Sequence, residues 1–240
     1  MKLQRRSGIL AFAMALALPA LGQSAERASE VRGQVTLVSA GAGVSKKDAS
    51  RVVVWLTPVN SVQPVRATER PHYRLRQRDK RFEPGLLVVP VGSVVDFPNA
   101  DPWFHNVFSL YRGKRFDLGL YQAGAQRSVR FDRPGPSYLF CNIHPEMTGV
   151  ILAVESELFA LTDKNGRYAL AGIAPGKYLL HVWYENAAPE LLEASARTVN
   201  IEALTRTLPV ISIAVTVQSP TEHKNKYGQD YDPDTLKTDY

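Results

Sequence analysis

The stretch FDRPGPSYLFCNIHPEMTGVILAV, residues 131–154, decides how this sequence of 240 residues is interpreted. It contains two apolar runs rich in aromatic and β-branched residues, with a polar loop between them, which is the pattern of two adjacent strands. The loop carries Cys141, the only cysteine of the chain, with His144 three residues later and Met147 three residues after that. A thiol, an imidazole and a thioether therefore project from one loop at the end of a strand.

The single cysteine excludes a disulfide within the chain, and the N-terminus indicates export. A basic start is followed by an apolar run at residues 9–20 and by small residues that suit a cleavage site. This is the pattern of a secretory signal peptide, so we expect residues 1–22 to be removed and the mature protein to be periplasmic. A free thiol is a liability in an oxidising compartment unless something holds it. No later stretch is long and apolar enough to cross a bilayer, so we expect no membrane span.

The basic residues are unevenly distributed. The formal net charge is +6, and loss of residues 1–22, with three basic residues and no acidic one, lowers it to +3. The basic segment, residues 66–81, holds seven lysines or arginines: Arg66, Arg70, Arg74, Arg76, Arg78, Lys80 and Arg81. Either this segment is a solvated edge strand and loop, or it attracts an acidic partner or an anionic surface. Export disfavours nucleic acid as that partner.

Nearly every regular element that the sequence predicts is a strand. Short runs rich in valine, leucine, phenylalanine and tyrosine are bounded by glycine, proline, asparagine and aspartate, as in sandwiches and barrels. The clearest are residues 31–38, 51–59, 85–90, 93–97, 105–110, 128–131, 137–141, 149–154, 167–170, 177–184 and 208–215. Only residues 189–196 have a helical pattern, and this stretch is too short for a parallel α/β unit. We therefore expect an all-β protein.

The length left after processing, about 218 residues, is more than one small sandwich needs. Residues 73–154 have a complete strand rhythm of their own. The flanks, residues 30–65 and 155–217, have too few strands to close a core separately but enough to do so together. We therefore expect one domain inserted in, or packed beside, another, followed by a polar tail at residues 218–240.

The second flank contains TDKNGRYALAGIAPGKYLLHVWYE, residues 162–185. Asn165–Gly166 predicts a tight hairpin because both residue types tolerate positive φ, and Pro175–Gly176 repeats the signal. The pattern resembles the carboxypeptidase regulatory-like domain, a small transthyretin-like sandwich, over residues 158–184. That resemblance implies a second β-sandwich with a non-catalytic, scaffolding or adhesive role.

A thiolate and imidazoles, with a weakly bound thioether, are the ligands that copper takes in electron-transfer sites. Zinc gains little from methionine, and calcium and magnesium require oxygen ligands. The loop at Cys141 offers one histidine, so a second imidazole must come from elsewhere. His105 is the candidate, because it begins a strand, HNVFSL, directly after the turn-rich FPNADPWF, residues 97–104.

Residues 82–109, FEPGLLVVPVGSVVDFPNADPWFHNVFS, together with residues 131–154 resemble the cupredoxin family, within which the ligand loop is of the amicyanin-like type 1 copper kind. The resemblance covers residues 73–154 and implies a Greek-key sandwich holding one type 1 copper. It implies His105, Cys141 and His144 as equatorial ligands and Met147 as the axial one. It further implies that Asn106 links the two ligand-bearing segments by hydrogen bonds and that Asn99 structures the turn before His105.

These observations favour a periplasmic copper protein that carries single electrons between redox partners and is not an enzyme. One alternative is a copper module for delivery or storage, although the processed chain keeps a single methionine, Met147. A second is a nitrite-reducing or multicopper enzyme, which needs more histidines for another centre, whereas we interpret His72, His181 and His223 as structural. A third is a scaffold protein. The sequence does not identify the redox partner protein.

Overall fold

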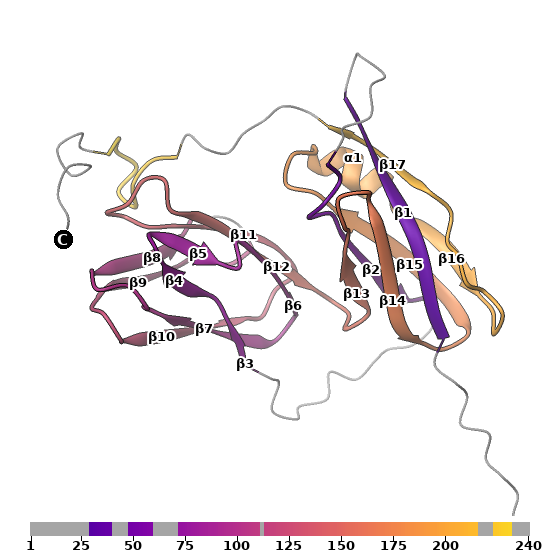
Figure 1. Cartoon of the computed structure of the whole chain (residues 1–240), viewed down its shortest axis with the longest axis horizontal. Coiled ribbons are helices and arrows are strands. Elements are labelled where there is room, and N and C mark those ends of the chain that lie inside the picture. Colours follow the sequence, from indigo (N-terminus) through magenta and orange to yellow (C-terminus); the bar gives the residue numbers. More distant parts are fainter. Residues whose placement is uncertain (1–28, 40–47, 60–71, 111–112, 216–222, 232–240) are drawn as a thin grey trace, which may run out of the picture.

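The structure is a computed structural model that describes residues 29–39, 48–59, 72–110, 113–215 and 223–231 (Figure 1). These residues form seventeen strands and one short helix, α1 (Pro189–Ala194), which confirms the all-β prediction. The predicted signal peptide, residues 1–22, and residues 66–71 of the basic segment lie outside the described residues. Within the described part of the chain, no helix has the length and apolar character needed to cross a membrane.

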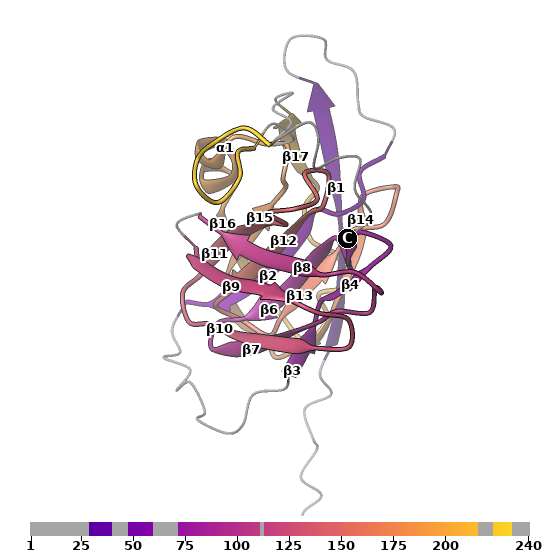
Figure 2. The same cartoon turned by 90° about the vertical axis from the view of Figure 1, so that its left-hand side faces the viewer.

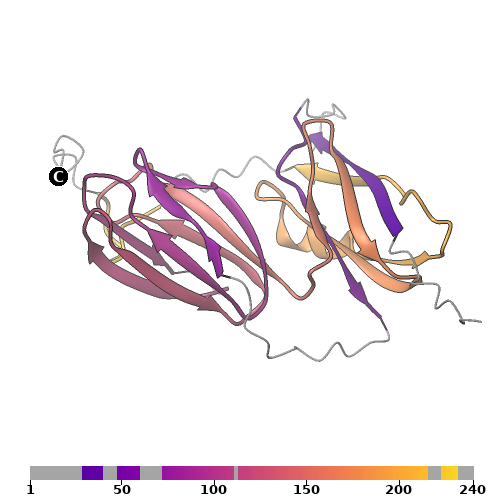
Figure 3. The same cartoon turned by 60° about the horizontal axis from the view of Figure 1, so that its bottom comes forward.

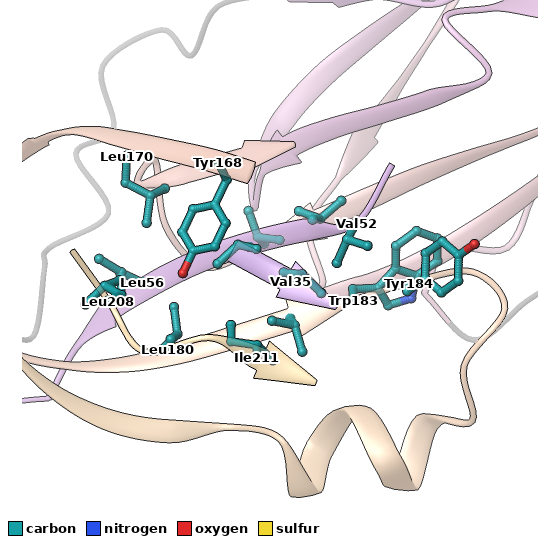
Figure 4. Packing of buried hydrophobic residues seen from close by; sticks show 14 of the residues in the cluster. Val35, Val52, Leu56, Tyr168, Leu170, Leu180, Trp183, Tyr184, Leu208 and Ile211 are labelled. Atoms are coloured by element: carbon teal, nitrogen blue, oxygen red, sulfur yellow. The ribbon is translucent and has the colours of Figure 1, made fainter. Parts of the chain in front are cut away.

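One pair of sheets, here called the first sandwich, contains the first and the last strand of the described chain. Its three-stranded sheet has the order β14 (Arg167–Ile173), β1 (Ser29–Ser39), β17 (Ile211–Val215). Its four-stranded sheet has the order β13 (Phe159–Leu161), β2 (Val53–Pro58), β15 (Gly176–Trp183), β16 (Arg197–Ile201). Figure 4 shows side chains from both sheets meeting in one apolar core, among them Val35, Leu170 and Leu180.

A second pair of sheets, the second sandwich, is formed by the strands between β2 and β13. Its three-stranded sheet has the order β10 (Gln126–Phe131), β7 (Ser93–Pro98), β3 (His72–Arg74). Its five-stranded sheet has the order β6 (Leu86–Pro90), β12 (Thr148–Val154), β11 (Gly135–Phe140), β8 (His105–Ser109), β9 (Phe116–Tyr121). A small hairpin joins β4 (Arg76–Arg78) and β5 (Arg81–Glu83). Side chains such as Phe97 and Ile151 unite the two sheets in a second core.

Strand β12 is buried on both faces, because one face packs in the second sandwich and the other packs against the first. Successive side chains of a strand point to opposite faces of its sheet. Ile151 accordingly lies in the core of the second sandwich, whereas Val150 and Leu152 join Leu86 and Val88 of β6 in the core cluster of the first. Figure 1 shows β6 and β12 on the side of the second sandwich nearest the first, and Figure 3 shows the two sandwiches side by side from another direction. Figure 2 views the molecule from the end of the second sandwich that lies away from the first.

The chain leaves the first sandwich after β2 and returns to it at β13. The division into domains at residues 73–154 and 30–65 plus 155–217, with a tail at 218–240, stays a prediction, because it concerns independent folding.

A tight turn forms at Asn165–Gly166, where the N–H of Gly166 donates to the carbonyl of Asp163 at 2.9 Å. The prediction that this turn and Pro175–Gly176 each join two paired strands of a hairpin is wrong. The strands that flank each turn, β13 and β14 in one case and β14 and β15 in the other, belong to different sheets. Gly166 does have positive φ, at 74°, but the turn passes the chain from one sheet to the facing one. Turn residues specify a local reversal, whereas the pairing of the flanking strands depends on which partners the rest of the chain supplies.

Candidate metal centre

Three predicted ligands from two separate segments converge at one end of the second sandwich. His105 begins β8, and Cys141 and His144 follow β11, which pairs with β8 through Phe140 and Phe108. One donor atom from each of the three residues lies within 4.8 Å of the other two. Cys141 Sγ lies 3.8 Å from His105 Nδ1 and 3.5 Å from His144 Nδ1, and the two nitrogens are 3.2 Å apart.

This spacing fits a single metal ion. Bonds of about 2.0 Å to nitrogen and about 2.3 Å to sulfur, the values known for zinc, place donor atoms about 3.3–3.7 Å apart in tetrahedral or trigonal sites. The three separations, 3.2, 3.5 and 3.8 Å, lie close to that range. The donor set of one thiol and two imidazoles is the one that blue-copper sites use.

The ligand loop, residues 141–147, is closed by its own backbone. The N–H of Cys141 donates to the carbonyl of Met147 over 3.3 Å, and the N–H of Met147 donates to the carbonyl of His144 over 3.0 Å. Beyond the loop, β11 and β12 pair from Phe140 and Thr148 onward. Cys141 and Met147 are fully buried, whereas His144 is partly exposed. The loop thus turns the thiol and the thioether inward and leaves one imidazole near the surface.

The sulfur of Cys141 is surrounded mainly by apolar residues but accepts hydrogen bonds from backbone N–H groups. Burial raises the pKa of the Cys141 thiol, and hydrogen bonds from the backbone N–H groups of Asn106, Ile143 and His144 oppose that rise. Without a cation the thiol therefore keeps its proton. A metal ion that displaces the proton would meet a thiolate already supplied with hydrogen-bond donors.

Asp101, which the sequence analysis did not single out, fixes the ring of His105. Its Oδ2 lies 2.8 Å from His105 Nε2, and both side chains are buried. Its two carboxylate oxygens also accept the backbone N–H groups of Asp79, at 2.6 Å, and Lys80, at 3.0 Å. Burial alone would raise the pKa of Asp101, but the hydrogen bonds from Lys80, His105 and Asp79 outweigh it and hold that pKa below its ordinary value.

The ionised Asp101 can only accept, so the imidazole of His105 carries its proton on Nε2 and directs the lone pair of Nδ1 toward Cys141. Burial lowers the pKa of His105 against the opposing effect of Asp101. Burial and the neighbouring His105 likewise lower the pKa of His144 to about 4. Both rings are therefore neutral near neutral pH, which is the form that ligates a metal.

The two asparagines differ in how they support the site. Asn99 organises the turn before His105, since its amide nitrogen donates to the carbonyl of Trp103 at 2.7 Å and its Oδ1 accepts the N–H of Asp101 at 3.0 Å. The side chain of Asn106 donates to Asp117 on β9 at 2.7 Å, and its Oδ1 has no hydrogen-bond partner among the described residues. Its backbone N–H donates to the sulfur of Cys141.

Other histidines take part in different contacts. His181 lies 2.8 Å from Thr57 Oγ1 and stacks on Trp55, and His72 lies 3.0 Å from Asp96. His223, also interpreted as structural, lies next to the ligand loop, where its Nε2 is 2.7 Å from the carbonyl oxygen of Pro145. Aromatic residues within the otherwise polar tail, such as Tyr231, indicate that it packs against a surface but do not indicate which one.

No family model matches this sequence, and no curated protein matches it. Solved structures match part of it. A copper-containing nitrite reductase from Thermus scotoductus is 25% identical, with a TM-score of 0.35, over 42% of this chain and 26% of its own, so this chain spans about a quarter of that enzyme. A purple cupredoxin from Nitrosopumilus maritimus is 22% identical, with a TM-score of 0.31, over 35% of this chain and 100% of its own. An amicyanin variant in its reduced Cu(I) form is 20% identical, with a TM-score of 0.34, over 37% and 87%.

Proposed function

We propose that this chain is a type 1 copper protein of the periplasm that transfers single electrons between redox partner proteins. The observation that carries the proposal is the convergence of two imidazole Nδ1 atoms and one thiol sulfur within 4.8 Å of one another. Both imidazoles are held neutral by burial, and the sulfur is supplied with backbone hydrogen bonds.

The soft sulfur donors of the ligand loop, the thiol of Cys141 and the thioether of Met147, favour copper over zinc. Thiolate and thioether donors select copper in its lower oxidation state, and imidazole suits both of its states. Met147 is fully buried and is hydrogen bonded through its backbone to Cys141 and His144. When bound, the metal would supply a Cu(II)/Cu(I) couple. His105 and Cys141 would anchor it in the buried interior, and His144, the partly exposed ligand, would lie toward an electron partner.

The proposed carrier role and an enzymatic role differ in the number of metal centres. A nitrite-reducing or multicopper enzyme needs a second copper site, so one copper per chain supports the carrier and two contradict it. A delivery or storage protein instead needs only to bind copper, and it needs no intense thiolate-to-copper absorption. A scaffold function predicts no specific copper uptake.

The test is a titration of the purified chain, lacking residues 1–22, with Cu(II), followed by its visible spectrum and copper content. We expect an intense blue thiolate-to-copper band that saturates at one copper per chain and is abolished in Cys141→Ser. A colourless product that holds Cu(I) tightly would overturn the carrier role in favour of delivery. Cell fractionation of the full chain, with and without residues 1–22, tests the periplasmic location.

A further inference from the structure

Residues 223–231, HKNKYGQDY, here called the C-terminal strap, lie against the second sandwich although the strand before them belongs to the first. β17 pairs with β1 of the first sandwich. Figures 1 and 3 show the strap, in yellow, beside the second sandwich on the side away from the first. Its position next to the ligand loop is therefore a long-range contact of the chain with itself.

The strap bonds to the ligand loop at three points. The hydroxyl of Tyr231 donates to the carbonyl of the ligand Cys141 at 3.0 Å. The backbone N–H of Lys226 donates to Asn142 Oδ1 at 3.0 Å. The ring N–H of His223 donates to the carbonyl of Pro145 at 2.7 Å.

Ring contacts accompany these bonds. The ring of His223 lies over that of Phe140, the residue before Cys141, with centroids 4.0 Å apart and an interplanar angle of 32°. The ring of Tyr231 meets His223 edge to face at 5.3 Å. The strap thus packs on the loop with aromatic surface as well as polar groups.

The strap also bonds to the segment that carries the other histidine. Lys226 Nζ lies 2.9 Å from Asp117 Oδ2 in β9, and Asp117 Oδ1 accepts the side-chain amide of Asn106 at 2.7 Å. Asn106 directly follows His105. Burial tends to raise the pKa of Asp117, but hydrogen bonds from Lys226 and Asn106 outweigh it and lower that pKa, so the carboxylate is ionised. Both ligand-bearing segments are therefore joined to one strap residue.

Hydrogen bonds within the strap hold it in a folded conformation of its own. Asn225 Oδ1 accepts the backbone N–H groups of Tyr227, at 2.9 Å, and Gln229, at 3.0 Å. The N–H of Asn225 donates to the carbonyl of Gln229 at 2.8 Å, and Gly228 adopts a φ of 78° that closes the turn. Such local bonds reduce the conformational entropy that the segment loses when it packs on the loop.

We propose that the C-terminal strap is a working part of the metal centre, with Tyr231 and His223 as positioning residues that hold the ligand loop in its metal-binding conformation. This inference rests on the proposed function for the identity of the metal. A loop that already has its metal-binding conformation rearranges less when the metal binds and opens less often afterwards. The strap therefore slows release of the metal, and it also protects the buried thiol from reagents in the solvent.

The test uses copper-loaded full-length variants. Tyr231→Phe removes the hydroxyl bond to Cys141 and keeps the ring, and His223→Phe keeps the stack on Phe140 and removes the bond to Pro145. Tyr178→Phe is the matched control, because its hydroxyl also donates to a backbone carbonyl, that of Ala174, but within the first sandwich. We expect transfer of Cu(I) to a competing chelator to be about fivefold faster in each strap variant, about the effect of one hydrogen bond. A shift of the thiolate-to-copper band should accompany it, with no change in the control.

A second measurement needs no copper. In the metal-free protein, Cys141 should react with an aromatic disulfide about fivefold faster in Tyr231→Phe, and at least tenfold faster in a chain that ends at residue 217, than in the wild type. Unchanged thiol reactivity, release rate and spectrum in the two point variants would overturn the strap proposal. Failure of the wild-type protein to bind copper would overturn the proposed function instead, and the thiol measurement would still decide the strap. If the shortened chain does not fold, the point variants decide alone.

Discussion

The carboxylate of Asp101 and the imidazole of His105 form a buried pair, with Oδ2 and Nε2 2.8 Å apart. Two backbone N–H groups of the turn between β4 and β5 hold the carboxylate from its other side. The ring of His105 is thereby fixed in one tautomer and one orientation before any metal is present. Pairs of this kind raise ligand basicity and orient the metal-facing nitrogen.

The first prediction concerns this pair. Asp101→Asn should weaken copper affinity about 10-fold or more, the usual effect of losing a carboxylate that orients a ligand histidine. Chelator competition at fixed pH measures the affinity. Asp132→Asn, at an exposed carboxylate paired with Lys114, serves as the control and should leave affinity unchanged. Equal affinities in the two variants would contradict the role given to Asp101.

The second prediction follows from the different burial of the two histidines. His144→Gly should lose the blue band and regain it on addition of free imidazole, because the ring of His144 is partly exposed and its removal opens a path to solvent. His105→Gly should respond far less, since His105 is fully buried. Visible spectra recorded during an imidazole titration compare the two. Equal recovery in both variants would argue against the assignment of His144 as the solvent-side ligand.

The third prediction concerns Met147. Met147→Leu conserves volume in the core, so the free energy of unfolding should fall by less than about 1.5 kcal/mol. The blue band should persist, and the reduction potential should rise, because leucine leaves a more apolar surrounding that disfavours the more highly charged Cu(II). Voltammetry and denaturant unfolding measure the two effects. A potential equal to that of the wild type would show that Met147 is not a ligand.

The fourth prediction concerns acid stability. Asp96 on β7 contacts Ser128 Oγ at 2.6 Å and His72 at 3.0 Å. Burial tends to raise the pKa of Asp96, but these bonds outweigh it, so that pKa lies below its ordinary value. Because the unfolded chain then binds the proton more readily, this contribution is present above about pH 4 and is lost as the pH falls through the lower, folded-state pKa. Asp96→Asn should lower stability at pH 7 and flatten its loss at acid pH, as measured by denaturant unfolding.

The fifth prediction separates the cost of backbone strain from the cost of a steric clash when a glycine of positive φ is replaced by alanine. Gly166 and Gly124 both have a φ of 74°, but an added Cβ would clash with the carbonyl oxygen of Val35 at Gly166 and would meet nothing within 4 Å at Gly124. Gly124→Ala should therefore cost about 1 kcal/mol, from backbone strain alone, and Gly166→Ala clearly more. Thermal unfolding measures both. Similar losses in the two variants would contradict the close packing of this turn on β1.

The sequence by itself determined the features that depend on spacing along the chain. The alternation of apolar residues specified the strands, and three-residue intervals placed Cys141, His144 and Met147 on one loop, because covalent geometry limits how far such side chains can separate. His105 was found from its own local signal, a strand start after a turn. Some strands escaped prediction, among them β9 and β16. Asp117 and Gly119 interrupt the apolar residues of β9, and β16 has only two apolar residues, Val199 and Ile201.

The tertiary structure alone decided which distant residues meet. The pairing of Asp101 with the backbone of the β4–β5 turn, the contact of Tyr231 with Cys141 across 90 positions, and the burial of both faces of β12 join segments whose patterns carry no mark of their partners. The same holds at Gly166, where the residue type indicates a turn and only the facing sheets determine that it crosses between them. Contacts of this kind depend on how whole sheets pack, so local composition and periodicity do not specify them.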